Sequence, residues 1–169
     1  IACMALGLGP GDWLWTVPIT FLASANCARY CGAGVDFVDI DPVTRNMSVT
    51  ALAEKLEAAK GAGRLPRVVI PVHFTGRPCD MTAIRALSRR YGLSVSDDAA
   101  HAVGSAINGT PVGNGRDSEI TVFSFHPVKV VTSAEGGMAV TNDAELARRM
   151  RVARSHGMER EPARFEQVP

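Results

Sequence analysis

The sequence has neither a large excess of one charge nor a long apolar run. Its 18 basic and 17 acidic side chains give a formal net charge of +1, which provides no basic surface for nucleic acid or an acidic membrane. No apolar stretch approaches the ~20 residues that a transmembrane helix requires. We therefore expect a protein that binds neither nucleic acid nor a membrane.

Cysteine is also scarce, and its spacing excludes two common uses. The four cysteines form no Cys-x-x-Cys pair, and no histidine follows them at the spacing typical of a zinc site. We expect no metal site and no disulfide framework. Free, mostly buried thiols in a reducing cytoplasm are the default for such a chain.

Lysine is the rarest charged residue, with only three copies. Lys55 and Lys60 lie in a polar helical pattern, whereas Lys129 follows the apolar run 120–125 and has no acidic residue within four positions. Such a lysine can lay its stem on apolar surface and reach water. It can also lose its proton and become a nucleophilic amine. The segment alone favours the first interpretation, and the rest of the chain favours the second.

The 169 residues are enough for one domain with a buried core. The chain opens on Ile1 inside a helical pattern, and residues 167–169 close it without a final element. We expect a segment of a longer protein.

Hydrophobic periodicity, glycine stops and capping residues predict an alternation of helices and strands. Helices are expected at 1–6, 20–31, 51–59 (capped by Ser48 or Thr50), 81–91 (between Asp80 and Gly92) and 144–154 (from Asn142), and strands at 13–17, 35–40, 67–73, 93–96, 119–125 and 138–141. This order predicts an α/β protein whose mostly parallel sheet is flanked by helices.

Polar residues follow several of the predicted strands. Asp97 and Asp98, His73, and the segment 124–129 all come at strand ends, and ligands bind outside the carboxyl ends of parallel strands. We expect these groups at one edge of the sheet. Neighbouring side chains alternate in direction along a strand, so only one of the two carboxylates should point into a site.

A carboxylate, an activated lysine and a hydroxyl at one sheet edge match what pyridoxal phosphate requires. The lysine bonds to the cofactor, the acid keeps the pyridine nitrogen protonated, and hydroxyl and backbone donors hold the phosphate. The same residues have simpler uses, because Asp97 and Asp98 also suit a capped turn and His101 a partly buried histidine bonded to backbone.

Three linked motifs carry a family resemblance: Asp98-Ala-Ala-His101, the segment Ser124-Phe-His-Pro-Val-Lys129, and Glu135-Gly-Gly. In this order they resemble the DegT/DnrJ/EryC1/StrS sugar aminotransferases over nearly the whole chain. The resemblance implies the large domain of fold type I pyridoxal-phosphate-dependent transferases. Residues 1–169 would form part of it, truncated at both ends and without the small C-terminal domain.

The resemblance also implies a role for each matching residue. Lys129 would be the Schiff-base lysine and the general acid/base, and Asp98 would bind the pyridine nitrogen. His101 would contact the ring or its phenolic oxygen, and Ser124 the phosphate. Phe21 would stack on the ring, although an ordinary core position is the alternative.

The implied reaction transfers an amino group from glutamate to a 4-keto nucleotide sugar, in a homodimer with shared sites. The wording of the 124–129 segment, with Arg154-Ser155-His156-Gly157, is most similar to the members of pseudaminic acid synthesis. Two alternatives remain. Related dehydratases use pyridoxamine phosphate and replace the lysine by histidine, which Lys129 argues against. A non-catalytic cofactor-binding or regulatory homologue is disfavoured, weakly, by the intact site residues. The 169-residue chain alone is expected to be inactive.

Overall fold

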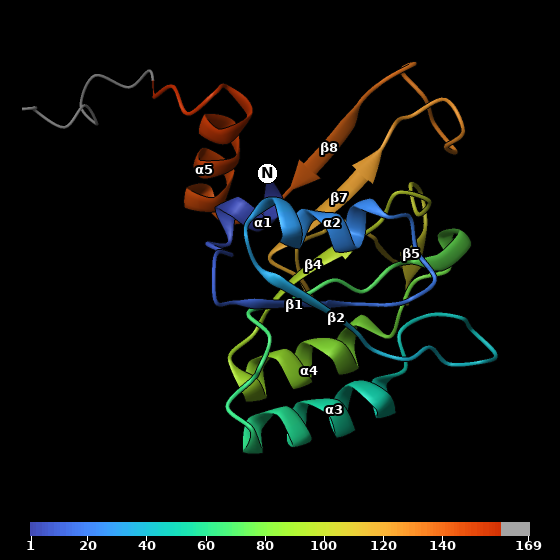
Figure 1. The fold of residues 1–169 in the computed structure, drawn as a ribbon. Helices are drawn as coiled ribbons and strands as arrows, with labels where there is room; N and C mark the ends of the chain where they lie inside the picture. The colour runs from blue at the N-terminus through green and yellow to red at the C-terminus, as the bar shows by residue number, and fades with distance from the viewer. Residues whose placement is uncertain (160–169) are drawn as a thin grey trace, which may run out of the picture.

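The computed structural model describes residues 1–159, which form a six-stranded sheet with helices on both faces (Figure 1). The strand order is β2-β1-β3-β4-β7-β8. The strands are β1 (Trp13–Thr16), β2 (Gly34–Phe37), β3 (Val68–Val69), β4 (Ser94–Asp98), β7 (Ile120–Ser124) and β8 (Gly137–Val140). All neighbouring pairs are parallel except β7 and β8. The predicted α/β class with a mostly parallel sheet is confirmed.

The helices divide between the two faces of the sheet. Helices α3 (Val49–Gly61) and α4 (Met81–Tyr91) cover one face and pack on each other. Helices α1 (Ala2–Ala5), α2 (Ala23–Tyr30) and α5 (Ala144–Arg154) lie on the other, with α1 against α5 (Figure 1). No helix within residues 1–159 is long and apolar enough to cross a membrane.

The core lies on the central strands. Leu14 of β1, Val68 of β3 and Val95 of β4 are fully buried, as expected for parallel strands covered on both faces. From the α3 and α4 side, Leu56 and Ile84 pack into the same cluster. The carboxyl ends of these strands therefore project from a rigid base.

Local signals placed α4 correctly at both ends. The Asp80 side chain accepts a hydrogen bond from the amide of Ala83, which caps the first turn. Gly92 ends the helix in the left-handed conformation, with φ 69°, which glycine adopts without a steric penalty.

Several strand boundaries differ from the prediction, and the expected strand 35–40 already ends at Phe37. The expected strand 67–73 forms a ladder only at Val68–Val69, because Pro71 has no amide hydrogen and the chain beyond it is irregular. Isolated bonds continue the alignment: the amide of His73 donates to the carbonyl of Asp98. Strand β4 in turn extends through Asp98, two residues beyond the prediction, so both aspartates lie within it.

The predicted cap of α5 is wrong by one residue. Asp143 caps the helix, because its Oδ1 accepts from the amides of Glu145 and Leu146 at 2.8 and 2.9 Å. The side-chain amide of Asn142 instead donates from Nδ2 to the backbone carbonyl of Asn114 at 2.8 Å.

A small antiparallel hairpin, in a stretch where no strand is predicted, pairs β5 (Ala106–Ile107) with β6 (Thr110–Pro111). Its two turn residues, Asn108 and Gly109, have φ of 49° and 77°, the geometry that favours Asn-Gly. A short 3-10 turn, η1 (Phe74–Gly76), precedes α4.

Candidate active site

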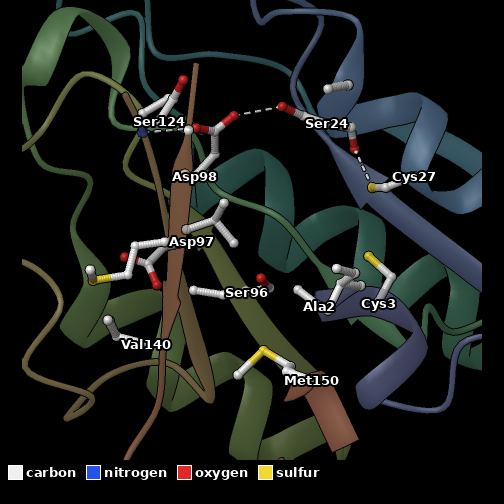
Figure 2. A pocket seen from close by; sticks show the side chains of 18 of the residues that line it. Ala2, Cys3, Ser24, Cys27, Ser96, Asp97, Asp98, Ser124, Val140 and Met150 are labelled. Atoms are coloured by element: carbon white, nitrogen blue, oxygen red, sulfur yellow. Dashed lines mark hydrogen bonds between the residues drawn. The ribbon is translucent and has the colours of Figure 1, made fainter. Parts of the chain in front are cut away.

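A hollow of about 1160 Å³ opens at the carboxyl ends of β4 and β7 (Figure 2). Helix α2 and strand β8 line it as well, together with residues of α1 and α5. Pockets for small ligands usually measure about 300–1,000 Å³, so this one has room for a cofactor and more. Its place outside the carboxyl ends of the strands is where parallel sheets bind ligands.

The structure brings four of the five predicted site residues to the wall of this hollow and places the fifth against one of them. Phe21, Asp98, Ser124 and Lys129 line it. His101 is not a lining residue, but its Nε2 lies 2.9 Å from the Lys129 Nζ. The ring of Phe21 is 73% exposed, so the alternative that it belongs to the core is wrong.

The carboxylate of Asp98 is held on both oxygens. Its Oδ2 accepts a hydrogen bond from the Ser24 hydroxyl at 2.7 Å, and its Oδ1 accepts from the amide of Ala100 at 3.0 Å (Figure 2). Ser24 comes from α2, 74 positions away along the chain, and is only 6% exposed. Sequence reasoning missed Ser24, because no local sequence pattern predicts a contact between residues so far apart in the chain.

Lys129 lies in the loop between β7 and β8, where its amide donates to the carbonyl of His126 at 2.9 Å. Its side chain forms no ion pair with a carboxylate within the part of the chain that the structure describes. The contact with His101 needs one nitrogen to donate and the other to accept. A proton can therefore be shared along this contact.

Ser124 ends strand β7, and its Oγ accepts weakly from the amide of His126 at 3.4 Å. The hydroxyl is left with its proton free to donate, as a phosphate oxygen requires.

Gly76 of the η1 turn supports the position of His101. Its φ is 87°, and a Cβ added there would lie 2.7 Å from the carbonyl oxygen of His101. The carbonyl of Gly76 in turn accepts from the Ser105 hydroxyl at 2.7 Å. The close approach requires glycine, so the 74–76 turn can pack directly against the segment that carries His101.

Asp97 contributes to the wall of the hollow, but both of its carboxylate oxygens are taken by buried neighbours. Oδ2 lies 3.1 Å from the His73 Nε2, and Oδ1 accepts from the Thr121 hydroxyl at 2.8 Å. His73 was expected to join the polar groups at the sheet edge. It is 1% exposed and contacts Asp97, so the structure does not bring it into the hollow.

All four cysteines are free, and two of them, Cys3 and Cys27, line the hollow. The two thiols shift each other: the neighbouring Cys3 lowers the pKa of Cys27, and the neighbouring Cys27, together with burial, raises the pKa of Cys3. On the other side of β4, burial raises the pKa of Cys79 to about 12.

The donor set of the hollow fits pyridoxal phosphate: an aromatic face at Phe21, a carboxylate at Asp98, a hydroxyl at Ser124 and an amine at Lys129. Together with the mostly parallel sheet, it defines the class of fold type I transferases that use this cofactor. The chain belongs to the DegT/DnrJ/EryC1/StrS aminotransferase family, whose sequence profile matches residues 1–168. Pyridoxal phosphate or pyridoxamine phosphate is the cofactor of that family and its structural neighbours, as predicted.

Two curated proteins have nearly the same level of sequence identity to this chain. GDP-perosamine synthase of Caulobacter vibrioides is 42% identical over 159 residues, which is 94% of this chain and 41% of that protein. The spore coat polysaccharide biosynthesis protein SpsC of Bacillus subtilis is 43% identical over 158 residues, 94% of this chain and 39% of that protein. The chain thus spans about two fifths of the length of these relatives.

Solved structures of the same family share the fold. An aminotransferase of this family from Brucella abortus superposes with a TM-score of 0.88 at 33% identity, covering 99% of this chain and 44% of that one. Helicobacter pylori PseC, an aminotransferase of pseudaminic acid biosynthesis, gives 0.82 at 30% identity, covering 99% and 45%.

Proposed function

We propose that this chain is the cofactor-binding part of an aminotransferase that transfers an amino group, with glutamate as donor, to a 4-keto nucleotide sugar. The observation that carries the proposal is the convergence of Phe21, Asp98, Ser124 and Lys129 on one hollow. Four unlike groups, drawn from separate elements, meet the separate needs of one cofactor.

Each group has a defined task toward the cofactor. Phe21 presents an exposed ring face suited to stacking. Asp98, already held by Ser24 and Ala100, keeps a proton on the pyridine nitrogen, and the Ser124 hydroxyl donates to the phosphate. When bound, the cofactor supplies an electron sink for the carbon that carries the amino group.

Lys129 is the residue that moves protons in this proposal. Its amine reaches into the hollow and lies against His101, so it can accept a proton from one position and return it at another. His101 holds the amine in place and can share its proton. A lysine also distinguishes this chain from the family's dehydratases, in which the resemblance implies histidine.

Two sugar classes are supported by different observations. The wording of the 124–129 segment and the PseC likeness support a UDP-linked 4-keto-6-deoxy-N-acetylhexosamine, as in pseudaminic acid synthesis. The 42% identity to a GDP-perosamine synthase supports a GDP-linked keto sugar instead.

We further propose that residues 1–169 form part of the large domain of a longer, cytoplasmic homodimer. Exposed apolar side chains support this, because Phe21, Val128 and Met138, which line the hollow, and Met4 and Leu22 elsewhere are more than half exposed. Exposed apolar surface of this kind marks places that other parts of a protein cover.

The test uses the full-length protein with pyridoxal phosphate. We expect a visible absorption band, and borohydride reduction should then label Lys129 and leave Lys55 and Lys60 unlabelled. Amination is measured by mass spectrometry with glutamate and with UDP- and GDP-linked keto sugars in parallel. Labelling without turnover on any keto sugar would favour the non-catalytic alternative, and absence of labelling at Lys129 would refute the proposal.

A further inference from the structure

Ser24 makes the closest side-chain contact to the carboxylate that would face the cofactor. Its hydroxyl donates to the Asp98 Oδ2 at 2.7 Å from the first turn of α2, and the two residues line the hollow together (Figure 2). At 6% exposure, Ser24 is shielded from water that would compete for this bond.

The hydrogen bonds around Ser24 have a fixed direction. An ionised carboxylate only accepts, so the single hydroxyl proton of Ser24 is used on Asp98. Thr20 lies 2.9 Å from the Ser24 Oγ and must therefore donate to it. The chain of donors runs from Thr20 through Ser24 to Asp98, and it ends on the carboxylate.

The second oxygen of Asp98 is held by the amide of Ala100 at 3.0 Å. With a donor on each oxygen, the carboxylate cannot rotate about its Cβ–Cγ bond without losing one of the two bonds. The amide of Ala100 belongs to the same segment as Asp98, whereas Ser24 belongs to a separate helix. The Ser24 bond is thus the contact that fixes Asp98 relative to the α2 wall of the hollow.

We propose that Ser24 is a positioning residue for Asp98, which it holds in the orientation that binds the ring nitrogen of the cofactor. The inference rests on the proposed function, because it assigns to Ser24 a task only if Asp98 meets that nitrogen. Thr20 contributes to the same positioning indirectly, because its hydroxyl donates a hydrogen bond to Ser24.

A purely structural role for Ser24 predicts different behaviour. Ser24 lies in the first turn of α2, and a serine there can stabilise a helix without any ligand. Its loss would then lower the melting temperature and leave the bound cofactor unchanged. The control for such an effect is Ser88→Ala, which removes a hydroxyl that is 2% exposed on α4 and donates to the carbonyl of Arg85.

The experiment measures pyridoxal phosphate affinity by absorbance titration and the pH midpoint of the visible band in the full-length protein. Ser24→Ala should weaken affinity roughly tenfold, as expected for a lost bond to a charged group, and move the pH midpoint. Ser24→Thr keeps the hydroxyl and should restore both values. Ser88→Ala should change neither. Thr20→Val, at a less buried position, should move both in the same direction as Ser24→Ala but less.

A double-mutant cycle separates the positioning role from other effects. In the Asp98→Asn background, Ser24→Ala should add little, because its effect passes through the carboxylate. Full additivity would overturn the proposal, as would an unchanged affinity and midpoint in both Ser24→Ala and Thr20→Val. If the wild-type protein failed to bind the cofactor at Lys129, the proposed function itself would fall and this inference with it.

Discussion

Asp97 and Asp98 are neighbours on β4, yet their carboxylates have opposite surroundings. Asp97 is 3% exposed and is bonded to His73 and Thr121, both of them buried. Asp98 is partly exposed and lines the hollow. The pleat of the strand separates them, because consecutive side chains point to opposite faces. One residue type therefore serves the fold at position 97 and the proposed ligand site at position 98.

On the Asp97 side, which we call the closed side, the polar groups are bonded to one another in a chain of hydrogen bonds. The amide of Cys79 donates to the His73 Nδ1 at 3.1 Å, so the proton of the neutral ring lies on Nε2 and is donated to Asp97. The Cys79 thiol in turn bonds to the carbonyl of Val72. Each polar group named here has a protein partner, and no group is left for a ligand.

On the Asp98 side, some polar groups still have hydrogen-bonding atoms that no protein group uses. Within residues 1–159, the Lys129 amine is hydrogen-bonded to His101 alone, and the Ser124 hydroxyl accepts a hydrogen bond without donating one to the protein. Both carboxylates have two hydrogen-bond partners, so the proposed ligand face of β4 differs from its structural face in the exposure of Asp98 and in the unused donors of Lys129 and Ser124 beside it.

The largest expected effect is the loss of the amine on the open side. Lys129→Ala should lower turnover of the full-length enzyme by at least ~10²–10⁴-fold, the usual contribution of general acid/base catalysis. Pyridoxamine phosphate, which needs no lysine to stay bound, should still bind. The measurement is the amination rate with Lys60→Ala, an exposed lysine on α3, as the control. An alanine variant with half of the wild-type rate would contradict the catalytic assignment.

Exchanging each aspartate for its amide tests the two faces directly. Asp98→Asn should lower kcat/KM roughly tenfold to a hundredfold, because a neutral amide cannot hold a proton on the pyridine nitrogen as a carboxylate does. Asp97→Asn should affect stability more than activity, since its contacts are to His73 and Thr121. Equal kinetic losses in the two variants would show that the assignment of the faces is wrong.

Removing His73, on the Asp97 side of β4, should lower the free energy of unfolding. His73→Ala leaves one oxygen of the buried Asp97 carboxylate without its hydrogen-bond donor, and an unsatisfied buried group of this kind costs about 1–3 kcal/mol, and more when it is charged. The control is His126→Ala, since His126 is exposed and lies 3.9 Å from Glu135 in a loose pair. Urea unfolding followed by circular dichroism should show a change within about 0.5 kcal/mol for that control. Similar losses in the free energy of unfolding for the two variants would mean that the His73–Asp97 contact does not stabilise the fold more than an exposed histidine does.

The sequence predicted the elements best where local chemistry decides. Asp80 and Gly92 bound α4 as expected, because a cap and a left-handed stop act over a few residues. Strand β3 is shorter than its apolar run, because Pro71 interrupts the pairing with β1 and β4, and an apolar pattern alone does not show where such a ladder stops. The α5 cap was misplaced because Asn142 and Asp143 both suit a cap, and only the contact with Asn114 separates them.

The site residues, too, were predicted where local sequence decides and missed where long-range contacts decide. Motif order and strand ends brought Asp98, Ser124 and Lys129 together in the prediction, and the structure places them at one hollow. Ser24 was missed because its bond to Asp98 joins segments 74 positions apart. His73 was misjudged, since its place at a strand end says nothing about which way its ring turns.

The smallest predicted effect is a pH dependence from the closed side. Burial raises the pKa of the Cys79 thiol from its ordinary value of 9.0 to about 12, and the nearby Asp97 charge acts in the same direction. Between about pH 9 and 12 the unfolded chain loses this proton while the folded chain keeps it. The contribution of Cys79 to stability is therefore complete below pH 9 and declines as pH rises through that window, by at most about 1.4 kcal/mol per pH unit.

Cys79→Ala should remove this slope from the alkaline stability curve, measured as urea unfolding at pH 8, 9 and 10. Other groups that titrate in this range are common to both proteins and cancel in the difference. Cys31→Ala is the matched control, because the Cys31 thiol is only partly buried, whereas the Cys79 thiol is buried. Parallel curves for the wild type and Cys79→Ala would mean that water reaches Cys79. The closed side of β4 would then be as open as the side that carries Asp98.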